Sequence, residues 1–444
     1  MSTVLDDYER AIERNARWNY NVNLLSNVFF NLALSFIFGS TVLTLYASHL
    51  TDSALLIGLV PTIQSVMTVV PQLLMSRQTE RLPVKKKLFA KVNLVERVPY
   101  LWIGLLMLLV PEMPPMTAYL ILVCSLALAW TGSGVGAPAW KAMLSKVIPV
   151  NRRGRLFGVS SALGSLLGIG GAWLSRYLLA TQTYPRTFAY NFILCFVCHM
   201  ISYGLIMLTR EPPREPEGKD VSATEYWRRL PGVLSRNRNF ARYLVARMLI
   251  VMGAMASVYY VIYAKARFAV PDTFAAELTM TALISQVVAM PLLGAASDRR
   301  GFKWLLELAT VLQTVAMVAV LVSSTRTWLY GIFVLAYSAT AIMNLISISM
   351  VMEFCLPEDV PTFAALESTI IAVPTLLAPL LGGWLVDHVR LTAGLGSAAG
   401  AALSGYRVMF VVAALFSVLG YVMLHWFVQE PRHEAPAVGM HAAD

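Results

Sequence analysis

The chain has 444 residues, of which 57% are hydrophobic and 14% are charged, and its formal net charge is +10. A soluble domain carries about 25% charged residues, so this composition excludes a soluble enzyme and indicates a membrane protein. The positive charge would also suit a nucleic-acid-binding protein, and the positions of the basic residues have to distinguish the two. Four cysteines in a chain of this length do not form a disulfide framework.

Residues 1–20 contain three arginines and four acids but no apolar core, so they are not expected to be a cleavable signal peptide. Their apolar residues recur at helical spacing. This pattern predicts a short helix that lies on the membrane surface.

Twelve apolar segments follow, each long enough to cross a hydrocarbon core of about 30 Å. They cover residues 24–48, 53–75, 88–110, 117–138, 156–180, 187–209, 241–264, 273–296, 304–324, 328–352, 362–386 and 405–428. The chain is therefore divided into five parts: an N-terminal cytoplasmic or interfacial segment 1–20, a six-helix bundle 21–209, a cytoplasmic linker 210–240, a second six-helix bundle 241–428 and a cytoplasmic tail 429–444. Within the linker, a capping box at Ser222–Glu225 predicts an amphipathic helix over 222–238.

The basic residues orient these spans. With both termini in the cytoplasm, 26 of the 35 Lys and Arg residues fall in inner segments and seven in outer ones. Such an excess on the inside is typical of multi-pass membrane proteins. The charge of +10 therefore reports topology, no nucleic-acid partner is expected, and the predicted location is the inner or plasma membrane of the cell.

Two separate features repeat at almost the same interval, which is close to half the chain. A Glu-Pro pair follows the sixth span at Glu211 and the twelfth at Glu430. An acid followed by basic residues stands after the second span at Glu80 and after the eighth at Asp298. The agreement between the two intervals predicts two parallel six-helix halves, which is one transporter architecture.

The loop after the eighth span carries the most specific motif, Gly294-x-x-x-Asp298-Arg299-Arg300-Gly301-x-Lys303. It resembles the signature loop of the major facilitator superfamily, and with twelve spans the resemblance covers essentially the whole chain. The resemblance implies an all-α integral membrane protein with twelve transmembrane helices in two six-helix pseudo-repeats. The N-terminal copy departs from the family pattern, with Ser76 and Pro83 where glycine is usual and Glu80 where aspartate is usual.

The resemblance also assigns a gating role to these loops. An acid at the positive end of a neighbouring helix is stabilised, and the family places Asp298 near the start of the fifth span and Glu80 near the start of the eleventh. The expected gating residues are Glu80, Arg81, Gly294, Asp298, Arg299, Gly301 and Lys303. The alternative is a pair of solvated turns.

Polar side chains within the spans are candidates for substrate contact. Asparagine recurs every four residues from Asn15 to Asn31, and this spacing keeps neighbours on one helix face. The family resemblance implies that the first, fourth, seventh and tenth spans line the cavity. The candidates are Asn27, Asn31, Gln64, Trp130, Tyr259, Tyr260, Gln286, Tyr337 and Asn344. For each of them, helix packing or an interhelical hydrogen bond is the alternative.

Charged residues within spans are functional hypotheses. The candidates for ion coupling are Glu96, Arg97 and Glu367, with Glu96 first for a proton. The alternative explanation is an ion pair on the cytoplasmic side or a side chain that snorkels to the membrane surface, and it is favoured for Glu307 and Arg247.

Several patterns are misleading. Cys195-x-x-Cys198-His199 matches the pattern for c-type haem attachment, but it lies in mid-span, so His199 is expected to be a packing or cavity residue. The cysteine and histidine spacing predicts no zinc site. The sequence has no G-x-x-x-x-G-K-[ST] phosphate loop. We therefore expect neither a cofactor nor enzymatic activity.

The sequence predicts a secondary active transporter that moves a small organic solute by alternating access, with export of an amphipathic compound ahead of uptake. The first alternative is an uptake symporter for a sugar or an organic acid, coupled to protons or sodium. The second is a membrane sensor, scaffold or lipid-handling protein on the same fold. We expect a monomer whose partners are its substrate and membrane lipid.

Overall fold

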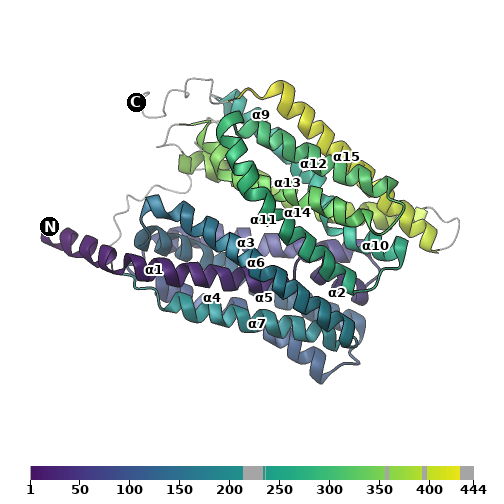
Figure 1. Ribbon diagram of the computed structural model, residues 1–444, viewed down its shortest axis with the longest axis horizontal. Helices are drawn as coiled ribbons and strands as arrows, with labels where there is room; N and C mark the ends of the chain where they lie inside the picture. The colour runs from purple at the N-terminus through teal and green to yellow at the C-terminus, as the bar shows by residue number, and fades with distance from the viewer. Residues whose placement is uncertain (1, 214–233, 236, 356–359, 393–397, 431–444) are drawn as a thin grey trace. The chain divides into compact units, whose positions relative to one another are not determined.

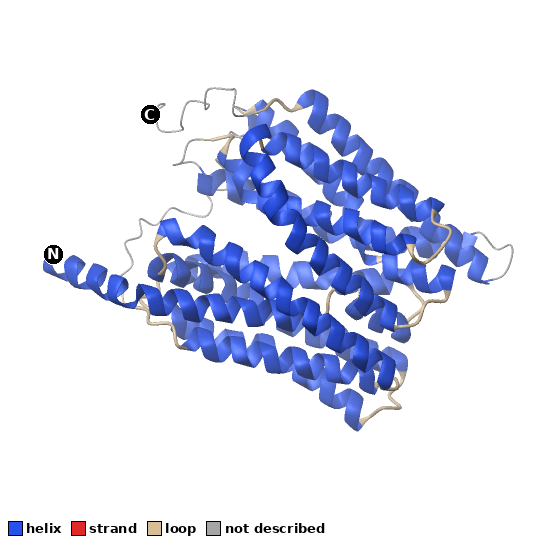
Figure 2. Cartoon of the chain, viewed as in Figure 1, coloured by secondary structure: helices blue, strands red, loops and turns tan. Residues whose placement is uncertain are grey.

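The computed structural model describes residues 2–213, 234–235, 237–355, 360–392 and 398–430. Every regular element in these residues is a helix (Figures 1 and 2). The elements are α1 (Ser2–Phe36), α2 (Val42–Leu50), α3 (Ala54–Glu80), α4 (Lys85–Leu109), α5 (Pro115–Val147), α6 (Val150–Thr181), α7 (Arg186–Met207), α9 (Arg238–Gly253), the 3-10 helix η1 (Ala254–Val258), α10 (Tyr260–Phe268), α11 (Thr273–Arg300), α12 (Phe302–Val322), α13 (Trp328–Met352), α14 (Val360–Thr392) and α15 (Ala398–Phe427).

Among the described residues, ten helices are long and apolar enough to cross a membrane. The other two predicted spans correspond to α1 with α2 and to α13, which contains a shorter apolar stretch, Trp328–Asn344. The predicted all-helical fold is confirmed. The linker helix predicted over 222–238 lies almost entirely outside the described residues.

Two predicted elements differ from the structure. The first is residues 1–20, which do not form a separate surface helix, because α1 runs without a break from Ser2 to Phe36. The second is the first span, predicted as one helix over 24–48, which ends at Phe36 and resumes at Val42. The seventh span is interrupted in the same way by η1. The interval between the two breaks is nearly that between the repeated loops, so the breaks belong to the internal repeat.

The chain forms two compact units, which are described separately. Unit 1 comprises Met1–Asp52, Ile63–Lys219 and Asp272–Met280. Unit 2 comprises Ser53–Thr62, Asp220–Pro271 and Thr281–Asp444. Two helices are therefore divided: the first turns of α3 belong to unit 2, and the first turns of α11 belong to unit 1.

Each unit has its own interior. In unit 1, α1 packs on α6 and α7, and α4 packs on α5 and α7. In unit 2, α15 packs on α9, α12 and α14. The core of unit 2 includes an aromatic group around Phe240, whose ring centroid is 4.7 Å from that of Phe363 and 5.4 Å from that of Phe354.

A buried carboxylate joins the helices of unit 1 just after α7. Glu211 accepts hydrogen bonds from the backbone N–H groups of Lys85 (3.0 Å) and Lys86 (2.8 Å), the first residues of α4. Its oxygen also lies 3.1 Å from Lys146 Nζ on α5, and its side chain is fully buried. The first N–H groups of a helix have no partner within the helix, so Glu211 satisfies two of them and adds its charge to the favourable end of the helix dipole.

The segments that contain Glu211 and Glu430 are held by equivalent contacts in the two units. In unit 1 the Asn19 side chain and the Arg210 backbone exchange two hydrogen bonds of 3.0 and 2.8 Å. In unit 2 Asn239 makes the same exchange with Gln429, at 3.1 and 2.9 Å. Gly301, with φ +86°, precedes α12, and a Cβ there would lie 2.9 to 3.0 Å from the carboxylate of Glu430. The predicted repeat of the Glu-Pro pairs is therefore a structural repeat.

Replacing Glu211 with alanine should destabilise unit 1 by about 3 kcal/mol, because a buried ion pair is broken and helix N–H groups lose their acceptor. Thermal unfolding of the purified protein in detergent measures the effect as a lowered midpoint. The exposed Glu112 provides the matched control, and Glu112→Ala should leave the midpoint unchanged. Equal midpoints for both variants would contradict this role of Glu211.

Candidate functional site

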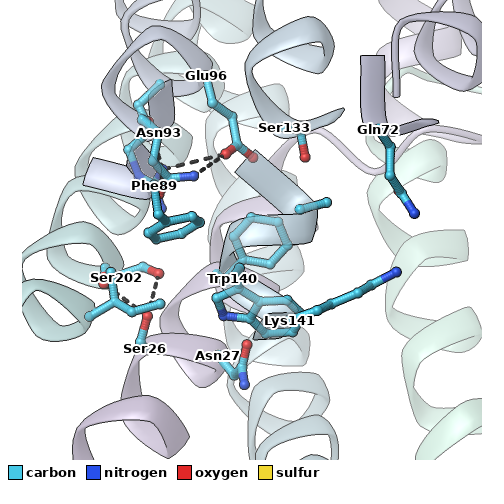
Figure 3. Close-up of a pocket in the computed structure, with 14 residues that line it drawn as sticks. Ser26, Asn27, Gln72, Phe89, Asn93, Glu96, Ser133, Trp140, Lys141 and Ser202 are labelled. Carbon is cyan, nitrogen blue, oxygen red and sulfur yellow. Dashed lines mark hydrogen bonds and ion pairs between the residues drawn. The ribbon is translucent and has the colours of Figure 1, made fainter. Parts of the chain in front are cut away.

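Unit 1 contains a cavity of about 240 Å³ among α1, α3, α4, α5 and α7 (Figure 3). Aromatic rings and convergent polar groups share its wall. It is lined by Ser26, Asn27, Phe30, Gln72, Phe89, Asn93, Glu96, Arg97, Ser133, Ala137, Trp140, Lys141, Ser202 and Ile206. A concave site that combines apolar walls with a few polar groups is typical of small-molecule binding.

The spacing of α4 places the polar group of the cavity on one helix face. Phe89, Asn93 and Arg97 recur every four residues, Glu96 lies three residues after Asn93, and all four are buried. Gly132 of α5 faces them, and a Cβ there would lie 2.8 Å from the backbone nitrogen of Glu96. Only glycine permits this approach of the two helices.

Glu96, Asn93 and Arg97 form a buried polar cluster. Asn93 Nδ2 donates to Glu96 Oε2 at 2.6 Å, and Arg97 Nη1 lies 3.5 Å from the same oxygen. The Ser133 side chain lies beside this carboxylate (Figure 3). None of the three residues is more than 4% exposed. A buried charge is costly unless it is paired and hydrogen-bonded, so the guanidinium and the amide together stabilise the carboxylate within the membrane-spanning region.

Arg97 is also held from a second helix. Its Nε donates to the backbone oxygen of His199 on α7 at 2.8 Å, and its Nη1 donates to the backbone oxygen of Asn93 at 2.7 Å. The guanidinium lies over the ring of Tyr203, 5.4 Å from the centroid. This set of contacts fixes the guanidinium as a structural counter-charge.

The Cys-x-x-Cys-His pattern lies beside this cluster. Cys195 and Cys198 are free thiols. The His199 ring is buried between Phe30 and Tyr100, with centroids 5.1 and 5.2 Å away. His199 is thus a packing residue, which is one of the two roles predicted for it.

The asparagine series of α1 divides into two functions. Asn15 and Asn19 hydrogen-bond to Arg210, and Asn23 donates to Thr209 at 3.0 Å, so these residues connect α1 to the segment after α7. Asn27 lines the cavity. Asn31 donates to the backbone oxygen of Asn27 at 2.8 Å.

Other predicted substrate residues are not part of this cavity. In unit 1, Gln64 lies next to the break after α1, with its Oε1 4.0 Å from where a Cβ on Gly39 would lie. Trp130 Nε1 is buried and has no hydrogen-bond partner among the described residues. In unit 2, Gln286 is partly buried and Asn344 is exposed.

The tyrosines predicted to contact substrate are packed inside unit 2. Tyr259 donates to the backbone oxygen of Pro379 at 2.6 Å. Tyr260 stacks on Phe410 with centroids 5.4 Å apart. Tyr337 stacks on Phe333, also at 5.4 Å. Their visible role is packing, and substrate contact stays a prediction.

The other charged candidates, Glu367, Glu307 and Arg247, form ion pairs within unit 2. Glu367 Oε1 accepts from the Tyr243 hydroxyl at 2.8 Å and lies 3.8 Å from Arg247 Nε. Glu307 lies 3.7 Å from Lys303 Nζ and 3.1 Å from His425 Nδ1. These contacts match the ion-pair alternative given for both acids and for Arg247.

The predicted gating residues are only partly described. Gly294, Asp298 and Arg299 lie in α11 and Glu80 ends α3, but the side chains of the three charged residues lie outside what the structure describes. Gly301 has the positive φ of +86° that a tight turn requires. Lys303 donates to the backbone oxygen of His425 at 3.2 Å, and Arg81 is exposed.

Sequence reasoning missed several lining residues of the cavity. Asn93 could have been found, because it lies one helical turn before Glu96 and Arg97 on the same face. Ser133 and Trp140 look like ordinary residues of an apolar helix. Lys141 looks like a topology charge at the end of a span.

Three comparisons with known proteins bear on the fold. The sequence model of the family described as Major Facilitator Superfamily matches residues 24–276 and 244–442. None of the curated protein sequences matches this chain.

Three solved structures that share this fold are distant from the chain in sequence. A mutant of the nucleoside transporter NupG has a TM-score of 0.69 at 11% identity, covering 90% of this chain and 99% of its own. A D-xylose-proton symporter has a TM-score of 0.68 at 14% identity, covering 94% and 98%. A bacterial homologue of the human lysosomal transporter Spinster, inward-facing and unoccupied, has a TM-score of 0.64 at 13% identity, covering 92% and 96%. At these identities the likeness establishes the fold alone.

Replacing Arg97 with glutamine should destabilise the protein by about 3–5 kcal/mol, because it leaves the buried Glu96 carboxylate without a counter-charge. Glu96→Gln should cost less, because Arg97 keeps its bonds to the backbone oxygens of His199 and Asn93 and the new amide keeps an acceptor oxygen for Asn93. Thermal unfolding in detergent compares the two, with the exposed Arg152→Gln as control. A smaller loss for Arg97→Gln than for Glu96→Gln would contradict the assigned roles.

Proposed function

This chain belongs to the major facilitator superfamily, and we propose that it is a secondary active transporter that moves a small organic solute across the membrane. The observation that carries the proposal is the cavity of unit 1, which is lined both by the buried polar cluster of Glu96, Asn93 and Arg97 and by aromatic rings. A purely structural bundle would fill this space with apolar side chains, because interiors are close-packed.

An unsatisfied donor supports a ligand at this place. Asn27 lines the cavity, and its buried Nδ2 has no hydrogen-bond partner among the described residues. Buried polar groups in native structures nearly always have a partner, from the protein or from water. A polar substrate, or the water that it displaces, would satisfy this donor.

We also propose alternating access, on the evidence of the two divided helices. In unit 2, Asp387 on α14 accepts from the backbone N–H groups of Ala54 and Leu55, at 2.9 and 3.0 Å, and from the Ser53 hydroxyl at 2.6 Å. A carboxylate that caps a helix in this way stabilises its N-terminus. These bonds connect the first turn of α3 to unit 2, while the rest of α3 belongs to unit 1.

The start of α11 supports the same proposal from unit 1. His49 Nε2 lies 2.7 Å from Asp272 Oδ2. Arg176 Nε donates to Glu277 Oε1, also at 2.7 Å. These polar contacts bind the first turns of α11 to unit 1, while the rest of α11 belongs to unit 2. We therefore assign the two helix ends as the outer gate of the transport cycle.

Reconstituted liposomes test the transport proposal. Purified protein should give saturable flux of at least one class in a panel of radiolabelled amphipathic compounds, sugars and organic acids. Flux with an imposed gradient in either direction distinguishes export from uptake. If no solute in the panel moves while a protein or lipid partner binds, the sensor or scaffold function replaces this one.

Glu96 is our candidate for proton coupling, because it is the acid that lines the cavity of unit 1. We expect solute flux through the wild type to change with an imposed pH gradient. Glu96→Gln should remove that dependence while it keeps solute exchange at equal pH, since the amide cannot ionise. Glu367→Gln is the comparison variant. Flux of the wild type that does not depend on pH would eliminate proton coupling, and dependence on a sodium gradient would replace it.

Asp387→Ala should release the first turn of α3. Hydrogen bonds to a charged acceptor contribute about 1.5–3 kcal/mol each, so we expect amide exchange of residues 53–62 to accelerate about tenfold or more. Asp387→Asn, which keeps one acceptor oxygen, should give a smaller acceleration. Hydrogen–deuterium exchange with mass spectrometry measures both, and unchanged exchange in Asp387→Ala would refute the assigned gate.

A further inference from the structure

We propose that the ligand of the cavity in unit 1 is a small organic anion with a planar apolar body, held by the ammonium group of Lys141. This inference rests on the proposed transport function and narrows its substrate class. It depends on three properties of the cavity: the balance of its charges, the place of Lys141 and the nature of the remaining wall.

The charged residues that line the cavity do not cancel. Glu96 is negative, while Arg97 and Lys141 are positive. Glu96 and Arg97 lie 3.5 Å apart and neutralise one another. Lys141 takes part in none of the ion pairs between described residues, and it is exposed. One positive charge of the lining therefore has no counter-charge in the part of the chain that the structure describes, and an anion would supply it.

The carboxylate is poorly suited to bind a cation from outside. Its Oε2 already accepts from Asn93 at 2.6 Å and faces Arg97. Glu96 is 4% exposed, so an incoming ammonium group would have to displace these partners and approach Arg97 as well. Like charges within a low-dielectric site repel strongly.

The polar groups away from Glu96 suit a carboxylate or a similar anion. Figure 3 shows the ends of the Lys141 and Gln72 side chains on the same side of the cavity. An ammonium group and an amide N–H are both donors. A charge-assisted hydrogen bond from lysine to a carboxylate is stronger than a bond between neutral groups.

The rest of the wall suits a flat apolar group. Phe30, Phe89 and Trp140 line the cavity, and aromatic side chains favour offset or edge contacts with another ring. The volume of about 240 Å³ lies below the range of about 300–1,000 Å³ of sites for drug-sized ligands. The ligand is therefore small, of the size of an aromatic monocarboxylate with one or two rings.

Three probes with the same ring system and different charges test the proposal. Isothermal titration calorimetry of the purified protein in detergent measures binding of 1-naphthoate, of the neutral 1-naphthamide and of the cation 1-naphthylmethylammonium. We expect 1-naphthoate to bind at least tenfold more tightly than the amide, and the cation to bind more weakly still. Preference for the cation or the amide, or no binding of any probe, would overturn the assignment of an anion.

Substitutions at Lys141 test the residue itself. Lys141→Gln should weaken 1-naphthoate binding at least tenfold and leave 1-naphthamide binding unchanged, while Lys141→Arg should keep the preference. The exposed Lys87 does not line the cavity, and Lys87→Gln is the matched control. Equal affinity of wild type and Lys141→Gln for 1-naphthoate, with equal unfolding midpoints, would refute the role of Lys141.

The liposome assay separates this inference from the transport function. Flux of a neutral or cationic solute that is unchanged in Lys141→Gln would overturn the inference and leave the transport function intact. If no solute moves although 1-naphthoate binds in a manner that depends on Lys141, the anion site stands and the transport function fails.

Discussion

The interior of this protein is governed by one constraint: a polar group within a membrane-spanning helix has to find its partner inside the protein, because hydrocarbon offers none. The Glu96 carboxylate depends on Asn93 and Arg97, and Arg97 depends in turn on the backbone of α7. This chain of contacts joins α4 to α7 and lines the cavity with charge at the same time. The site and the packing of unit 1 are therefore produced by the same hydrogen bonds.

The same constraint explains the internal repeat. A helix begins with backbone N–H groups that need acceptors. In unit 1, Glu211, in the segment after α7, accepts from the first N–H groups of α4, the helix of the third span. An asparagine on the first helix of each half fixes the same segment by exchanging two hydrogen bonds with its backbone. It is Asn19 in the middle of α1 and Asn239 in the first turn of α9. The Glu-Pro pairs therefore repeat in the sequence where the same pair of backbone hydrogen bonds repeats in the structure.

Much of this architecture could be predicted from the sequence, because apolar length and the distribution of basic residues are strong patterns. The helix breaks after Phe36 and at η1 could not be predicted, because the apolar runs continue through them. The single Gly39 is only a weak indication of a break. The cavity was predicted only in part. Asn27 and Glu96 are polar residues where a membrane span is expected to be apolar, so the sequence indicates a function for them. Lys141 lies at the cytoplasmic end of a span, where basic residues are expected from the topology alone. Tyr259 and Tyr260 are buried inside unit 2. Aromatic residues in a span serve packing as readily as binding, so their contact with substrate stays a prediction.

The charged residues of the cavity differ in how firmly they are held, and this difference suggests how one cavity can both bind a substrate and release it. Glu96 and Arg97 are buried and bonded to the backbone or to each other, so we expect them to move little when a ligand enters. Lys141 is exposed on a long flexible side chain, and ordering it costs entropy that only a bound counter-charge offsets. A substrate that binds too tightly would not leave a transporter. A fixed neutral pair beside one mobile charge keeps the electrostatic gain modest, and this balance suits a site that has to load and release in every cycle.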